Sequence, residues 1–186
     1  MTTTQHDTTT AGPTTTWTID PAHTAVEFAV KHMMITTVKG RFAAVQGTVE
    51  IDESDITGSQ VDVTIDAASI DTREEKRDAH LRSPDFFDVE RFPQLRFVSR
   101  QVEKGGKGLR LIGDLTIRGT TREIVLDVEE SGRGTDPWGG ERAAFTASGK
   151  LNRLDYGLKW NQALETGGVL VANDVRITLD VQLIRA

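Results

Sequence analysis

Apolar and polar residues alternate along most of the chain from Trp17 onward, with a period of two residues. In the segment AVEFAVKH, for example, apolar side chains at positions 26, 28 and 30 alternate with charged ones at 27 and 31. Strands with one buried and one solvent-facing side are typical of antiparallel sheets. Six further segments repeat this alternation, with apolar residues at Val45, Val49 and Ile51; Val61, Val63 and Ile65; Leu109, Leu111, Leu115 and Ile117; Ile124, Leu126 and Val128; Phe145, Ala147 and Leu151; and Val175, Ile177, Leu179, Val181 and Leu183.

Glycine-rich segments separate these strands and predict hairpins at residues 104–108, 118–120 and 131–140. We count about eight strands in residues 17–186, several of them longer than the usual length of about 5–6 residues. Such strands, in up-and-down order, either form two packed sheets or close into a barrel, and closure is favoured because it removes exposed edges. The predicted fold is all-β, an eight-stranded antiparallel barrel.

The barrel interior can be filled by side chains or can hold one small ligand, and both outcomes are known for eight strands. The alternation alone favours a filled core and leaves an open lumen as the alternative. Six aromatic residues on different strands or strand ends would share this interior: Trp17, Phe28, Phe42, Phe97, Phe145 and Trp160.

One helix is expected over residues 73–83. Thr72 and Glu75 have the spacing of a capping box, which places Thr72 at the N-cap, and Pro84 is a natural stop. Only Ala79 and Leu81 are apolar in this segment, so we expect the helix to lie on the surface.

Composition narrows the possible functions. The chain has 186 residues, a length that suits a single globular domain. It has no cysteine, which excludes disulfides, thiolate metal sites and a cysteine nucleophile. The net charge of −6 argues against a general nucleic-acid-binding protein, so no nucleic-acid partner is expected.

The first sixteen residues form a polar segment in which nine residues are Thr. This segment cannot bury apolar surface, so we predict a disordered tail over residues 1–16, followed by one domain over residues 17–186. It lacks the basic and apolar regions of a secretion signal, and no later run of apolar residues is long enough to span a membrane as a helix. The expected location is the cytoplasm.

Motifs for phosphate binding, metalloprotease activity or serine hydrolysis are absent from the sequence. The four histidines show no metal-ligand spacing, so neither a metal nor another cofactor is expected. For His80, Arg77 and Asp78 are possible partners. Arg153, close to Asp155 and Tyr156, suggests a structural salt bridge.

Four segments of the chain, residues 17–42, 68–99, 113–128 and 147–158, resemble the YceI-like family of polyisoprenoid-binding, lipocalin-like bacterial proteins. The similarity includes WTIDPAHTAVEFAVKH, the central run DAHLRSPDFFDVERFPQLRFVS, the hairpin GDLTIRG and the ending NRLDYGL. These segments occur in the same order as in the family. The resemblance covers nearly all of the chain from Trp17 to the C-terminus.

The resemblance implies an extended antiparallel barrel with a helix across one side, a hydrophobic channel that holds an isoprenoid or other long-chain lipid, and a homodimer. A lipid needs no catalytic group, because each buried CH₂ contributes about 0.8 kcal/mol. Alternation and resemblance together place Phe42, Phe86, Phe87 and Trp160 near the mouths of the channel. They place the other ligand-binding candidates along its wall: Val26, Phe28, Val30, His32, Phe97, Leu115, Ile117 and Phe145.

Two other functions are alternatives to lipid binding. The barrel of an enzyme could act as a reaction chamber for a lipid-like substrate, with His32 as the acid/base group and a carboxylate to orient it. The third possibility is a stress-related structural protein without a ligand.

Overall fold

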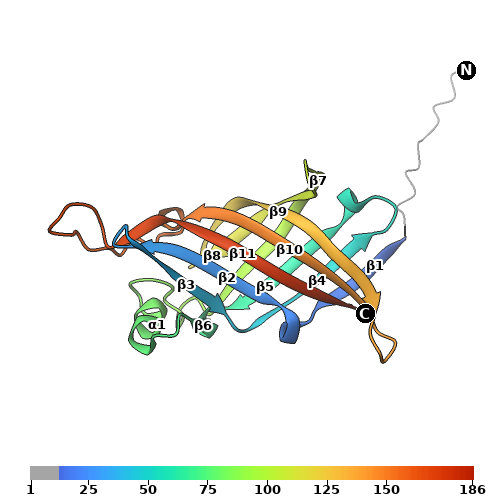
Figure 1. The fold of residues 1–186 in the computed structure, drawn as a ribbon, viewed down its shortest axis with the longest axis horizontal. Helices are drawn as coiled ribbons and strands as arrows, with labels where there is room; N and C mark the ends of the chain where they lie inside the picture. The colour runs from blue at the N-terminus through green and yellow to red at the C-terminus, as the bar shows by residue number, and fades with distance from the viewer. Residues whose placement is uncertain (1–12) are drawn as a thin grey trace, which may run out of the picture.

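The computed structural model describes residues 13–186, which form a long barrel with one helix beside it (Figure 1). The helix α1 spans Glu75–Arg82, and four short 3-10 turns are η1 (Pro21–His23), η2 (Ile56–Gly58), η3 (Ala67–Ser69) and η4 (Arg153–Tyr156). The strands are β1 (Thr14–Ile19), β2 (Ala25–His32), β3 (Thr36–Phe42), β4 (Val45–Asp52), β5 (Gln60–Asp66), β6 (Ile70–Asp71), β7 (Gln94–Lys104), β8 (Leu109–Ile117), β9 (Thr120–Thr135), β10 (Glu141–Asn152) and β11 (Val171–Arg185).

Three of the eight barrel strands are bent, and each bent strand consists of two consecutive segments. β1 and β2 lie end to end along the same edge of β11, with η1 between them. In the same way β3 continues into β4, and β5 continues through η3 into β6. The pairing of β1 with β11 closes the ring, and every pairing is antiparallel. The predicted eight-stranded antiparallel barrel is confirmed.

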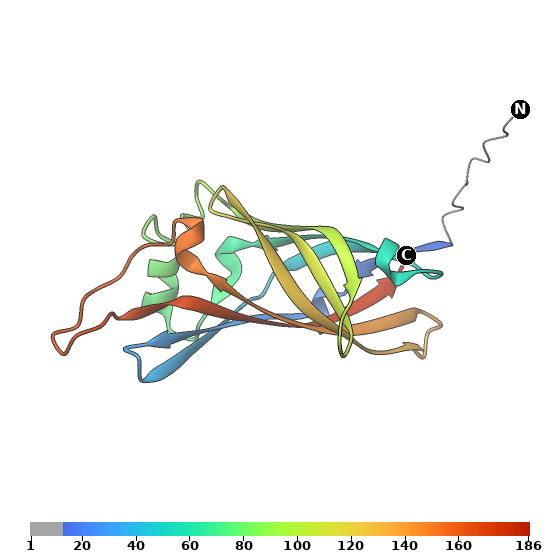
Figure 2. The same ribbon diagram turned by 90° about the horizontal axis from the view of Figure 1, so that it is seen from above.

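The barrel is elongated because its later strands are long (Figure 2). β9 has 16 residues and β11 has 15. At about 3.3 Å per residue, each extends for roughly 50 Å. The predicted glycine-rich hairpins connect β7 to β8, β8 to β9 and β9 to β10, although the last begins later than expected because β9 continues to Thr135.

The helix α1 lies at one end of the barrel, beside β3 and the two-residue strand β6 (Figure 1). It begins two residues later than predicted, and Glu74 rather than Thr72 is the N-cap. The Glu74 carboxylate accepts the backbone N–H groups of Lys76 and Arg77. Thr72 serves another purpose, because its N–H and hydroxyl both donate to the buried carboxylate of Asp78. The expectation that Thr72 caps the helix is therefore wrong.

The predicted tail overlaps the first strand. Thr14 to Thr16 belong to β1, where they pair with Asp52, Ile51 and Glu50 of β4. The β-branched threonines suit an extended chain, and they lead directly into the buried Trp17. The tail prediction is wrong for these residues, and its first twelve positions lie outside the described part of the chain.

Candidate functional site

A cavity of about 570 Å³ occupies the interior of the barrel. This volume lies within the range of roughly 300–1,000 Å³ that is typical of small-molecule sites. Its wall extends from Ser59 and Val102 at one end to Leu170 and Val171 at the end where α1 lies. The seven alternating apolar sets that the sequence identifies all contribute to this wall. The barrel is therefore an open lumen, and the filled core favoured by alternation alone is not observed.

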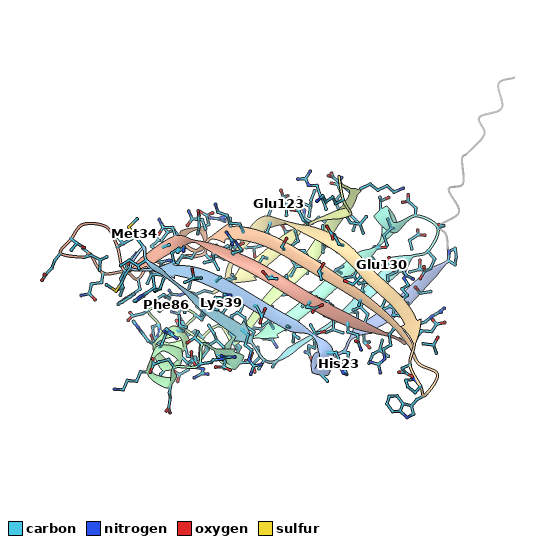
Figure 3. The ribbon with its side chains drawn as sticks, in the orientation of Figure 1. His23, Met34, Lys39, Phe86, Glu123 and Glu130 are labelled. Atoms are coloured by element: carbon cyan, nitrogen blue, oxygen red, sulfur yellow. The ribbon has the colours of Figure 1, made fainter. Side chains whose placement is uncertain are left out.

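All twelve candidate residues line this cavity: Val26, Phe28, Val30, His32, Phe42, Phe86, Phe87, Phe97, Leu115, Ile117, Phe145 and Trp160. The structure brings several of them into contact. The Phe28 and Phe42 ring centroids are 5.7 Å apart, and Phe42 meets Phe87 edge-on at the same distance. Phe86 lies 5.5 Å from Trp160, and Figure 3 shows Phe86 at the α1 end. Contact of these residues with a ligand stays a prediction.

Most polar groups of the wall lie at the α1 end; besides them the wall includes Thr24, Glu27 and Ser59. Lys31 and His32 end β2, while α1 supplies Lys76, Arg77 and His80. The remainder of the wall is mostly aliphatic and aromatic. The cavity is thus amphipathic along its length, apolar through the barrel and cationic at one end. Sequence reasoning missed the residues from α1, because its few apolar residues indicated a helix facing solvent.

The cations at this end lack partners of opposite charge. Among residues 13–186, no carboxylate lies within 4.0 Å of Lys31, Lys76 or Arg77. Arg77 instead donates from Nε to the Thr72 hydroxyl at 2.7 Å and from Nη2 to the Thr72 carbonyl at 2.8 Å. The Asp78 carboxylate reaches Arg77 only through Thr72.

Arg153 is a further cation in this wall, and it is only 3% exposed. Its guanidinium donates to the carbonyl groups of Ala172 at 2.8 Å, Trp160 at 2.9 Å and Val171 at 3.3 Å, and also to that of Leu158. Burial lowers the pKa of Arg153 below its ordinary value.

The predicted salt bridge of Arg153 is wrong, since no carboxylate in the described chain lies within 4.0 Å of this guanidinium. The reason is the turn η4, which ends at Gly157 in the left-handed region (φ 76°) and returns the chain over the arginine. Backbone carbonyls then occupy its donors. Arg153 thereby fixes the segment 158–172 to the end of the barrel.

The two histidines of the wall differ in their surroundings. His80 pairs through Nε2 with Asp85 at 2.8 Å, and not with Asp78. Its ring meets Trp160 edge-on with centroids 4.7 Å apart. His32 makes no hydrogen bond to a carboxylate within residues 13–186. The orienting group that an acid/base role for His32 requires is therefore not in place among these residues.

Neither a metal-binding cluster nor a membrane-spanning helix is found in residues 13–186. No cluster of three or more His, Asp or Glu side chains there is arranged to hold a metal ion. In the same range, no helix has the length and apolar character needed to cross a membrane.

Comparison with known proteins agrees with this architecture. Residues 17–183 match the YceI-like domain family. A UPF0312 protein of Staphylococcus aureus (strain MSSA476) is 40% identical over 87% of this chain and 93% of its own length. Among solved structures, BcnA of Burkholderia cenocepacia superposes with a TM-score of 0.76 at 24% identity, covering 88% of this chain and 98% of BcnA.

A polyisoprenoid binding domain from Saccharophagus degradans has the same fold. It superposes with a TM-score of 0.65 at 13% identity over 91% of this chain and 98% of that domain. The match to the family covers nearly all of the described chain and every strand that lines the cavity. The protein therefore belongs to the YceI-like family.

Proposed function

We propose that the protein binds an isoprenoid or another long-chain amphiphilic lipid inside the barrel, for carriage, storage or sequestration. The observation that supports this most strongly is the cavity of about 570 Å³, which is apolar along the barrel and cationic at the α1 end. A lipid tail fits the first part and its head group fits the second. The named function of the Saccharophagus degradans domain, polyisoprenoid binding, supports the same assignment.

The energetics favour a long tail. Immobilising a ligand costs roughly 4–15 kcal/mol, whereas each buried CH₂ contributes about 0.8 kcal/mol. A few five-carbon isoprene units therefore offset the cost without any polar contact. The twelve candidate residues are the proposed contacts, with Phe28, Phe97 and Phe145 along the tail and Phe86 and Trp160 beside the head group.

The head group in this proposal is anionic, a phosphate or a carboxylate. Arg77 and Lys76 are neighbours of like charge, and Arg153 is buried without a counter-ion in the described chain. Positive charge beside a low-dielectric cavity is costly unless an anion approaches it. An anionic head group therefore gains a charge-assisted contact with Arg77 that a neutral one cannot make.

The first experiment is native mass spectrometry of the purified protein, with identification of lipids in an organic extract. We expect a bound fraction whose added mass matches an extracted lipid. The second is titration with a polyprenol and the polyprenyl phosphate of equal length, and we expect the phosphate to bind about tenfold more tightly. A uniform ligand-free mass with no uptake of either compound contradicts lipid binding, whereas equal uptake contradicts only the anionic head group.

No observation on the described residues favours the enzyme or the ligand-free structural protein over lipid binding. The enzyme alternative assigns the acid/base role to His32. Activity on a lipid that survives His32→Ala would exclude this role. A homodimer and a cytoplasmic location stay predictions, and analytical ultracentrifugation tests the first.

A further inference from the structure

Exposed apolar side chains gather at one tip of the barrel. Among residues 13–186, eight large apolar side chains are exposed, and four of them are Met33, Met34, Ile35 and Val169. Met34 is 71% exposed and Ile35 is 76% exposed. We call these four residues the apolar tip. Figure 3 shows Met34 at the end of the molecule where Phe86 and α1 also lie.

The turn that presents these side chains is an unusual one for its sequence. The Ile35 N–H donates to the His32 carbonyl at 3.1 Å, and Met33 and Met34 both have positive φ, 52° and 58°. Positive φ at both central positions is characteristic of type I′ turns, which strongly prefer Asn and Gly there. The backbone of a methionine is strained in this region. The two apolar side chains are therefore present although the turn itself favours other residues.

The turn is held in place by the segment that Arg153 fixes. The Met33 N–H donates to the Leu170 carbonyl at 2.7 Å, and Met34 Sδ lies so close to Gly168 that a side chain at position 168 would touch it. Val169 lies between these two contacts. The apolar tip is therefore formed by two loops distant in sequence, the turn at residues 33–35 and the segment 158–172, which hold each other in place.

The surroundings of the tip suit a lipid surface. Lys31 immediately precedes the turn on β2, Lys39 lies three residue pairs farther along β3, opposite Ala29, and no acidic residue occurs between positions 28 and 40, although the whole chain carries −6. Apolar side chains flanked by lysine are the usual combination in proteins that rest in the membrane interface. His32 and Leu170, which adjoin the tip, also line the cavity.

A protein partner fits the tip less well. A stable protein interface buries about 800 Å² on each side, far more than four side chains on a projecting turn can cover. Unbranched methionine adapts readily to an irregular surface. We propose that the apolar tip inserts into the surface of a lipid bilayer and so places the cationic end of the cavity against the lipid head groups.

The test exploits the absence of cysteine from the chain. Single variants Met34→Cys and Trp138→Cys each accept one environment-sensitive fluorophore. Trp138 is the matched control, because it is 88% exposed and lies in the β9–β10 hairpin at the opposite end of the barrel (Figure 1). On adding vesicles of phosphatidylcholine and phosphatidylglycerol, we expect a blue shift from the label at 34 and none from the label at 138.

Vesicle flotation gives an independent measurement. The double variant Met34→Glu with Ile35→Glu should bind the same vesicles at least about tenfold more weakly, because two buried side chains are replaced by charges, while Trp138→Glu should bind like the unmodified protein. Lipid uptake from detergent micelles should be equal in all three, which separates docking from the proposed lipid binding. Equal flotation of the double variant, an equal shift at both labels, or a shift at 34 that follows protein concentration without vesicles would each overturn the proposal.

Discussion

The ring of Phe28 lies across the backbone of Gly40, its direct partner on the neighbouring strand β3. A Cβ at position 40 would collide with the edge of this ring, so only glycine leaves the ring against the wall. Phe97 covers Gly113 of β8 in the same way. An aromatic ring over a strand glycine supports the sheet where a side chain is missing. In this barrel the pairing also lets two large rings lie against the wall of the lumen.

The first prediction concerns this pairing. Gly40→Ala should lower the free energy of unfolding by about 1–3 kcal/mol, because the added methyl forces Phe28 off its position in a packed wall. The same change should reduce lipid uptake by moving the ring into the cavity. Chemical denaturation and a binding titration measure the two effects. Gly134→Ala is the control, since a Cβ at 134 meets nothing within 4 Å; an equal loss in both variants would contradict the role of the Phe28 contact.

The second prediction places Phe28 in the ligand path. Phe28→Arg should leave a folded protein that no longer takes up lipid, because its charged side chain enters the apolar part of the cavity. Circular dichroism checks the fold and mass spectrometry checks the bound lipid. Thr178→Arg puts the same side chain on the exposed face of β11 and should retain uptake. Unchanged uptake in the Phe28 variant would show that the ring does not face the ligand, and a collapse of the fold would show that the wall does not tolerate a charge at this position.

The sequence predicts which residues face the barrel interior, but it does not predict the size of the cavity that they enclose. Alternation identifies inward-facing positions, because side chains on a strand alternate strictly between the two faces. That rule was enough to place Val26, Phe97 and Phe145 on one wall. It does not give the volume enclosed, which depends on closure and on pairs such as Phe28 with Gly40.

The orientation of the helix and the paths of the turns do not follow from alternation, so features that depend on them could not be predicted. Alternation says nothing about which side of α1 turns toward the cavity, so Arg77 and His80 were missed. Arg153 has Asp155 two residues away, yet the turn at Gly157 decides that it meets carbonyl groups instead. The exposure of Met34 likewise depends on a turn type that its sequence does not favour.

The third prediction tests the cationic end. Arg77→Gln should bring the affinities for polyprenyl phosphate and polyprenol closer together by about tenfold, because one charge-assisted contact is lost. Titration of both ligands into each variant measures this ratio. Arg73→Gln removes an equal charge from an exposed residue that does not line the cavity, and its ratio should stay that of the unmodified protein. If both variants change the ratio equally, the effect is one of overall charge and not of a head-group site.

The last prediction concerns Tyr156, which is 1% exposed and whose hydroxyl has no hydrogen-bond partner among the described residues. Burial, with a smaller effect from the charge of Asp155, raises the pKa of Tyr156 to about 12. The phenol is neutral when protonated, and its folded pKa lies above the ordinary value of about 10. The folded state is therefore unaffected by this group below about pH 10 and loses stability as the pH rises from about 10 to 12.

Tyr156→Phe should remove that alkaline loss of stability and keep or slightly increase the stability at neutral pH, because no hydrogen bond within the described chain is broken. Thermal unfolding of both proteins across this pH range measures the difference, and a Tyr156→Phe protein that is much less stable at neutral pH would show that the hydroxyl has a partner.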